Sequence, residues 1–135
     1  MILYINTVAR NEIIIALRSV KTKINIEKKI KADKNRSELL VPAIEAFLKK
    51  NKVKLTALKK IIVASYGGSF TSLRIGVITA NALAYALRIP VEAEPVTDEQ
   101  GKKISMRCKK FGAYSIVEPI YDREPTIGIS KKPLL

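Results

Sequence analysis

The sequence predicts an α/β domain in which a mixed five-stranded sheet carries two helices. Apolar residues alternate with polar ones in short segments, and they recur every three to four residues in two longer segments. A glycine pair, Gly67-Gly68, joins the fourth expected strand to the second helix. The resulting order is three strands, helix, strand, helix, strand. This is the ribonuclease-H-like topology, which the actin-like ATPase (ASKHA) superfamily shares.

The first part of the chain predicts three strands and a helix. The strands are expected at residues 2–8, 12–20 and 23–27. Their short links favour an antiparallel meander. Asn35, followed by Glu38, resembles a capping box that would start a helix at residues 37–51.

The second part predicts a strand, the glycine loop, a helix and a last strand. These elements are expected at residues 61–64, 67–70, 71–87 and 90–93. Ser69 or Thr71 could cap the second helix. Strands that are joined through a helix form right-handed parallel crossovers.

Residues 1–94 are therefore expected to form one domain, and residues 95–135 a short C-terminal extension. In the extension the pattern indicates a turn, two short strands and a tail. They are expected at residues 98–101, 104–108, 115–121 and 126–135.

Composition indicates a soluble protein of the cytoplasm. Of the 135 residues, 47% are hydrophobic and 27% are charged, as is typical of globular domains. No apolar run approaches the roughly 20 residues of a membrane span, and the N-terminus does not resemble a signal peptide. The single cysteine, Cys108, fits a reducing compartment and is expected to be a small apolar filler.

The net charge of +13 has two interpretations. It could attract nucleic acid or another acidic partner. It could also reflect a lysine-rich composition, with most lysines in doublets on solvated faces. Such charge would strengthen binding to RNA without identifying it as the function.

Several kinds of catalysis are disfavoured by missing residues. The chain has no histidine, which removes the commonest general base and metal ligand. The first strand offers Asn6 where a two-metal nuclease or an actin-like ATPase would place aspartate. We expect neither a metal site nor an independent catalytic centre.

The second helix is apolar or small almost all round. Its small residues, four apart on one face, are Ser72, Gly76, Ala80 and Ala84. Such a helix is usually buried on more than one side. It could pack tightly on its own sheet, with the first helix covering the rest, or it could form an interface with a second subunit.

Three segments carry a resemblance to a known family. They are residues 66–76 (YGGSFTSLRIG), 36–44 (RSELLVPAI) and 119–125 (PIYDREP). They resemble the TsaB (YeaZ) family, a subunit of the machinery that makes threonylcarbamoyladenosine in tRNA. The resemblance covers residues 1–94 well and the tail weakly. Departures from the family pattern are Asn6 for aspartate, Gly67 for proline, and Ser72 and Ala82 for glycines. The family's second domain is expected to be reduced to a remnant.

The resemblance implies a non-catalytic subunit. TsaB-like proteins form homodimers and pair, through helices of their first domain, with a catalytic TsaD-like chain that modifies adenosine 37 of tRNA. A TsaE-like ATPase is a further expected partner, and ATP or ADP could lie at an interface of the complex. Residues implied in the partner interface are Leu40, Ile44, Phe47, Ser69, Phe70, Leu73, Arg74, Gly76, Val77, Ala80, Asn81 and Ala84. Residues implied in contacts with an anion or nucleotide are Gly67, Gly68 and Ser69.

Two other functions remain open at this point. The first is a stand-alone basic RNA-binding module with the same ribonuclease-H-like fold. The second is a peptidase, because the wider superfamily once carried a glycoprotease label. The missing catalytic groups argue against the peptidase.

Overall fold

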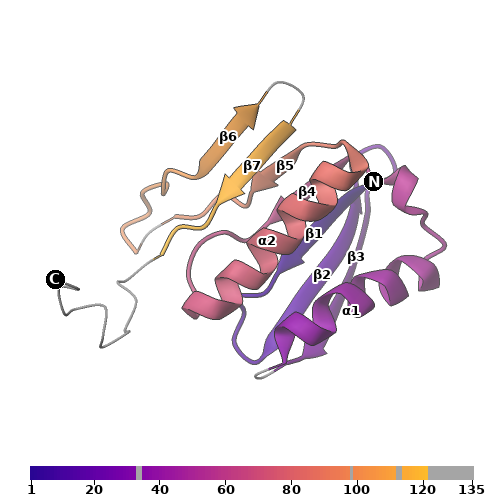
Figure 1. Ribbon diagram of the computed structural model, residues 1–135, viewed down its shortest axis with the longest axis horizontal. Coiled ribbons are helices and arrows are strands. Elements are labelled where there is room, and N and C mark those ends of the chain that lie inside the picture. The colour runs from indigo at the N-terminus through magenta and orange to yellow at the C-terminus, as the bar shows by residue number, and fades with distance from the viewer. Residues whose placement is uncertain (33–34, 98, 112–113, 122–135) are drawn as a thin grey trace, which may run out of the picture.

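The protein forms one mixed five-stranded sheet, two long helices and a separate β-hairpin (Figure 1). The structure is a computed structural model that describes residues 1–32, 35–97, 99–111 and 114–121. The sheet strands are β1 (Ile2–Asn6), β2 (Glu12–Ser19), β3 (Ile24–Lys31), β4 (Lys60–Val63) and β5 (Val91–Ala93). The other elements are α1 (Arg36–Lys50), a short 3-10 helix η1 (Leu55–Ala57), α2 (Phe70–Leu87), β6 (Arg107–Phe111) and β7 (Tyr114–Glu118). The predicted fold class is confirmed.

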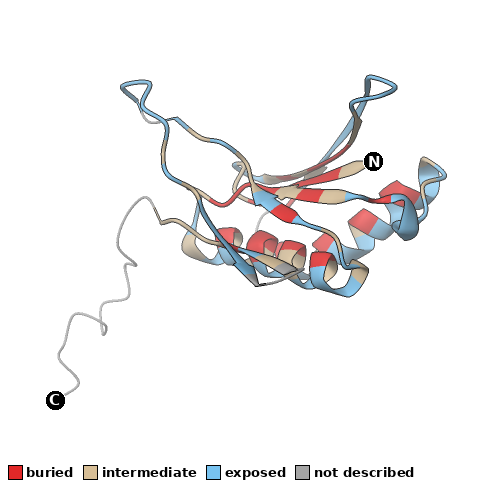
Figure 2. Cartoon of the chain, turned by 90° about the horizontal axis from the view of Figure 1, so that it is seen from above, coloured by how far each residue is buried: buried red, intermediate tan, exposed pale blue. Residues whose placement is uncertain are grey.

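The strand order in the sheet is β3-β2-β1-β4-β5. Strands β1, β2 and β3 form the predicted antiparallel meander. Strands β1, β4 and β5 run parallel, as the strand–helix–strand pattern requires. Both helices cover the same face of the sheet (Figures 1 and 2). Because β1, β4 and β5 run parallel, their carboxyl ends meet at one edge of the sheet. Ligands of open α/β sheets usually bind at such an edge.

The hydrophobic core lies between the sheet and the two helices. Alternate residues of the central strands point into it and are fully buried: Leu3, Ile5, Ile13, Ile15, Leu17, Ile61 and Val63. Helix α1 contributes Leu40, Ile44, Phe47 and Leu48, which recur at helical spacing. The helix face of β1, β2 and β4 is thus buried, and on the opposite face of the sheet Tyr4 and Ala16 are also buried.

The structure corrects some predicted details near the ends of elements. Asn35 precedes α1 but makes no side-chain cap bond, because its backbone (φ −110°, ψ 29°) is not in the extended conformation that points a cap side chain at the first turn. Strand β1 ends at Asn6, two residues early, because the Asn6 side chain binds the backbone that follows. Strand β3 runs on to Lys31, and β6 begins three residues later than expected.

The hairpin of β6 and β7 lies beside β5 and α2 (Figure 1). The predicted boundary near residue 94 falls between β5 and β6, and the expected tail at residues 126–135 lies outside the described residues. Among the described helices, one, Phe70–Leu87, is long and apolar enough to cross a membrane by length and composition alone. One side of α2 packs on the sheet through its buried residues.

Candidate partner-binding groove and glycine loop

The glycine loop turns the chain sharply between β4 and α2. Gly67 (φ +87°) and Gly68 (φ +70°) both lie in the left-handed region, which favours glycine. A side-chain carbon at Gly68 would also lie 2.7 Å from Cβ of Val8, which follows β1. Gly68 is therefore fixed by two constraints, its backbone conformation and its closeness to Val8.

Polar side chains accept hydrogen bonds from backbone N–H groups near this loop. The Ser69 hydroxyl accepts from the Ser72 N–H at 3.0 Å, so the predicted serine cap of α2 is confirmed. The Asn6 side-chain oxygen accepts from the N–H groups of Val8 and Ala9 at 2.9 and 3.1 Å. An anion at this edge of the sheet would compete with these bonds. Anion contact by Gly67, Gly68 and Ser69 stays a prediction.

A short segment, residues 119–121, crosses the carboxyl end of β4, and we call it the strap. The Ile120 N–H donates to the Ser65 carbonyl at 2.7 Å, and Tyr66 and Ile120 form an isolated parallel bridge. The Tyr121 ring stacks on Phe70, with centroids 3.9 Å apart and planes 11° from parallel. The edge of the sheet where a ligand could bind is therefore occupied by the chain itself.

Arg74 completes the contact between the strap and α2. Its Nε donates to the Tyr121 hydroxyl at 3.0 Å, and its guanidinium carbon lies 4.4 Å from the centroid of the Phe70 ring. This arrangement combines a cation–π contact with a hydrogen bond on one exposed arginine. It fixes the strap beside the first turns of α2.

The strap contact yields a graded prediction. Tyr121→Phe keeps the stacking on Phe70 but loses the bond from Arg74, and we expect it to lower the free energy of unfolding by about 0.5–1 kcal/mol. Tyr121→Ala also loses the ring pair, which is worth about 0.5–1.5 kcal/mol more. Urea unfolding of both variants checks the order, and equal losses would contradict the stacking contribution.

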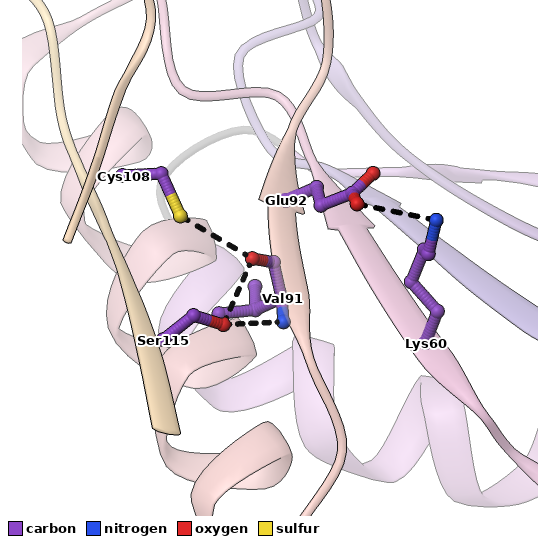
Figure 3. A network of polar contacts seen from close by, with 5 residues as sticks. All are labelled: Lys60, Val91, Glu92, Cys108 and Ser115. Carbon is purple, nitrogen blue, oxygen red and sulfur yellow. Dashed lines mark hydrogen bonds and ion pairs between the residues drawn. The ribbon is translucent and has the colours of Figure 1, made fainter. Parts of the chain in front are cut away.

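The hairpin is bonded to α2 and β5 by side chains. Asn81 Nδ2 donates to the Val117 carbonyl, and Asn81 Oδ1 accepts from the Val117 N–H, each at 2.9 Å. Ser115 Oγ lies 3.0 Å from the Val91 nitrogen and 3.2 Å from its carbonyl oxygen, and Cys108 Sγ lies 3.6 Å from the same oxygen (Figure 3). Cys108 itself is exposed, which does not fit its expected role as a small apolar filler.

The sheet-facing side of α2 carries the small residues. Leu73, Gly76, Val77, Ala80 and Ala84 are buried against the sheet. A side-chain carbon at Gly76 would collide with the Thr7 hydroxyl, which donates to the Ser72 carbonyl. Close packing of α2 on its own sheet therefore accounts for the glycine in its middle.

All residues expected at the partner interface make contacts within the chain. Besides the five on α2 just named, the core holds Leu40, Ile44 and Phe47. Ser69 caps α2, while Phe70, Arg74 and Asn81 bond to the strap and the hairpin. The buried residues among them could contact a partner only if the core unfolded. Their positions therefore do not support the predicted interface.

A third side of α2 faces solvent and forms a groove with α1. The groove has a volume of about 720 Å³. Its lining comes from α1, from the segment after it, and from α2: Val41, Ile44, Glu45, Leu48, Lys49, Val53, Leu55, Ile78, Thr79, Ala82, Leu83 and Ala86. Val41 is 57% exposed and Ile78 is 64% exposed, which is unusual for large apolar side chains so close together.

The interface predicted from the sequence and the lining of the groove lie on the same two helices but on different faces of them. Only Ile44 is shared between the predicted interface and the lining of the groove. The predicted interface does not include the groove residues Val41, Ile78, Ala82 and Ala86, because the small-residue stripe indicated the other side of α2. The available signal was that apolar residues extend around α2 beyond the stripe.

The described residues offer no metal site. None of them form a group of three or more histidine, cysteine, aspartate or glutamate side chains that could hold an ion. Tyr4, on the face of the sheet away from the helices, has a raised pKa because it is buried and its hydroxyl bonds to Glu94. It is neutral at physiological pH and lies in a structural network with Asn6 and Arg18.

Comparisons with known proteins find similarity to proteins whose names refer to tRNA modification. The family model described as "TsaD: tRNA N6-adenosine threonylcarbamoyltransferase" matches residues 23–94. The tRNA threonylcarbamoyladenosine biosynthesis protein TsaB of Bacillus subtilis (strain 168) is 42% identical over 60 residues, which are 44% of this chain and 26% of that protein.

Solved structures agree with these matches. YeaZ from Pseudomonas aeruginosa superposes with a TM-score of 0.63 at 25% identity, over 69% of this chain and 42% of that one. A structure titled as an uncharacterized protein with similarity to peptidase YEAZ, from the same organism, gives the same values. The chain thus spans less than half the length of these relatives. The resemblance to the TsaB (YeaZ) family and the ribonuclease-H-like fold are confirmed.

Proposed function

Because this chain belongs to the family of the tRNA N6-adenosine threonylcarbamoyltransferase TsaD, we propose that it acts in threonylcarbamoyladenosine formation as a TsaB-like, non-catalytic subunit. Its partner is a TsaD-like catalytic chain, and the groove between α1 and α2 is the surface that binds this partner. The observation that carries the proposal is the exposed apolar lining of the groove.

The groove suits a helical partner. A helix docks by placing residues three and four apart into an apolar groove between two other helices. Complete burial of an exposed valine or isoleucine side chain contributes about 1.5–3 kcal/mol to association. Val41 and Ile78 can supply much of this energy, since both are more than half exposed in the free chain.

The other two sides of α2 cannot play this role in the folded chain. The side with Gly76 and Ala80 packs on the sheet, and the side with Arg74 and Asn81 is bonded to the strap and hairpin. The groove side leaves the large apolar side chain of Ile78 64% exposed. A second copy of the chain could occupy the same groove, so homodimerisation and TsaD binding would exclude each other.

A non-catalytic role is supported by the chemistry of the chain. It has no histidine to hold a catalytic metal ion or to act as a general base. At the glycine loop, Asn6 and Ser69 already bind nearby backbone donors. Any ATP or ADP in a complex with TsaD-like and TsaE-like chains would therefore need donors from those partners.

One substitution tests the groove directly. Ile78→Asp places a charge where the partner would bury an apolar side chain, so we expect the affinity for the TsaD-like chain of the same organism to fall at least about 100-fold. Isothermal titration with the two purified chains measures this loss. Ile78 is 64% exposed, so the variant should fold normally.

Val20→Asp is the matched control. Val20 is 83% exposed and lies outside the groove, so its substitution should leave the affinity unchanged. If the folded Ile78→Asp protein bound the TsaD-like chain as tightly as the Val20→Asp protein, the groove would not be the interface.

The alternative of a stand-alone RNA-binding module predicts a different result. The chain alone would then bind tRNA tightly, and its affinity would fall steeply with salt concentration. Filter binding over a range of salt concentrations, with and without the TsaD-like chain, separates the two functions.

A further inference from the structure

Strand β3 is a long, uncovered edge of the sheet. It spans Ile24–Lys31 and, among the strands that the structure describes, pairs with β2 alone, at the end of the strand order (Figure 1). Within residues 1–32, 35–97, 99–111 and 114–121, no strand lies beside the N–H and C=O groups on its outer side. Such an edge is a template for pairing with another extended chain.

The helix layer leaves the first half of β3 uncovered. On β2, the residues that face the helices, Ile13, Ile15 and Leu17, are fully buried. On β3, the neighbouring residues Ile24 and Ile26 face the same side but remain 39% and 38% exposed. The β3 edge therefore presents alternating apolar side chains together with unpaired backbone.

The edge is strongly basic. Lysines at the turn before β3 and along the strand are all exposed: Lys21, Lys23, Lys28, Lys29 and Lys31. The acidic residue in this stretch is Glu27, whose carboxylate lies 4.0 Å from Lys29 Nζ in an exposed pair. Two copies paired along this edge would bring lysines together, which is unfavourable.

We propose that the β3 edge binds an extended, acidic segment of another protein by adding a strand to the sheet. Alternate apolar residues of that segment would cover Ile24 and Ile26 on the helix side. Its acidic residues would lie on the side of the sheet away from the helices, next to Lys29 and Lys31. Backbone bonds supply affinity in this mode, and the alternating side chains select the partner.

This binding does not depend on the groove. Ile24 and Lys31 are absent from the lining of the groove. The experiments on the two surfaces can therefore give independent results. A second copy of the chain or an RNA strand are the other conceivable occupants, and both are outcomes of the experiment.

The experiment uses the full chain and a fluorescent eight-residue peptide that alternates glutamate and valine. We expect it to bind at least about tenfold more tightly than the same peptide with lysine in place of glutamate. Hydrogen exchange should slow at residues 24–31 when the acidic peptide binds. Equal binding of both peptides, or protection elsewhere on the chain, would overturn the proposal.

Two charge-reversal variants locate the site. Lys29→Glu combined with Lys31→Glu should lower the affinity for the acidic peptide about tenfold, because each exposed charge pair contributes modestly. Lys49→Glu combined with Lys50→Glu, at the end of α1, should leave this affinity unchanged. The proposal fails if both double variants lose binding equally.

The same measurements address the other occupants. Protection of residues 24–31 that rises with protein concentration, without peptide, would indicate a second copy and overturn the proposal. Displacement of the acidic peptide by tRNA, with the same loss in the Lys29/Lys31 variant, would show that the surface recognises RNA instead.

Discussion

Gly76→Leu is expected to destabilise the folded protein strongly, because position 76 lies in the packing of α2 on the sheet. A side chain at position 76 collides with Thr7, whose hydroxyl is bonded to the Ser72 carbonyl and cannot move away freely. Overpacking of this kind costs about 3 kcal/mol or more for a leucine beside a backbone contact. Chemical denaturation monitored by circular dichroism measures the loss.

The matched control for Gly76→Leu is Ala82→Leu on the same helix. Ala82 is exposed in the groove, so a leucine there should change the free energy of unfolding by no more than about 0.5 kcal/mol. It should nevertheless alter binding to the TsaD-like chain. If the two variants were equally stable, α2 would not be packed on the sheet through Gly76.

Asn81→Leu is expected to release the hairpin from α2. The substitution leaves the N–H and C=O of Val117 without partners, and Val117 is only 1% exposed. Each unsatisfied buried group costs about 1–3 kcal/mol, so the free energy of unfolding should fall by about 2–4 kcal/mol. Hydrogen exchange at residues 107–118 should accelerate more than exchange in β1 and β2.

Asn25→Leu serves as the control for Asn81→Leu. Asn25 lies on the exposed strand β3, so the same change of side chain should have little effect there. Unchanged exchange in the hairpin of the Asn81→Leu variant would show that Asn81 does not anchor it.

The order of the elements could be predicted because each local pattern agrees with the fold. Alternation gave the sheet strands, and the glycine pair followed by Ser69 marked the start of α2. Strand β3 was predicted too short because its second half is lysine-rich. An edge strand tolerates these lysines, and sequence alone does not show which strand lies at the edge.

The faces of α2 could not be predicted in the same way. Its apolar surface showed that more than one side is covered, but not which partner covers each side. Asn81 and Val117 are 36 residues apart in sequence, and Phe70 and Tyr121 are also brought together only by the fold. Contacts of this range leave no periodic signal, so the sequence did not show that the hairpin covers one face of α2.

The assignment of the groove also depends on how α1 and α2 lie side by side. Val41 and Ile78 look like ordinary apolar positions in their separate helices. Only the packing of the two helices shows that both side chains remain exposed on one groove. An exposed apolar side chain indicates a binding surface only when other exposed apolar side chains lie next to it in the structure.

Hydrogen exchange of the chain, alone and bound to the TsaD-like partner, tests the central claim most directly. If the groove is the interface, exchange slows in the helical segments that line it, residues 41–49 and 78–86. The hairpin at residues 107–118 keeps its exchange rates, because its contacts with α2 already exist in the free chain. Protection of the hairpin and the glycine loop, with none in the groove, would contradict the account.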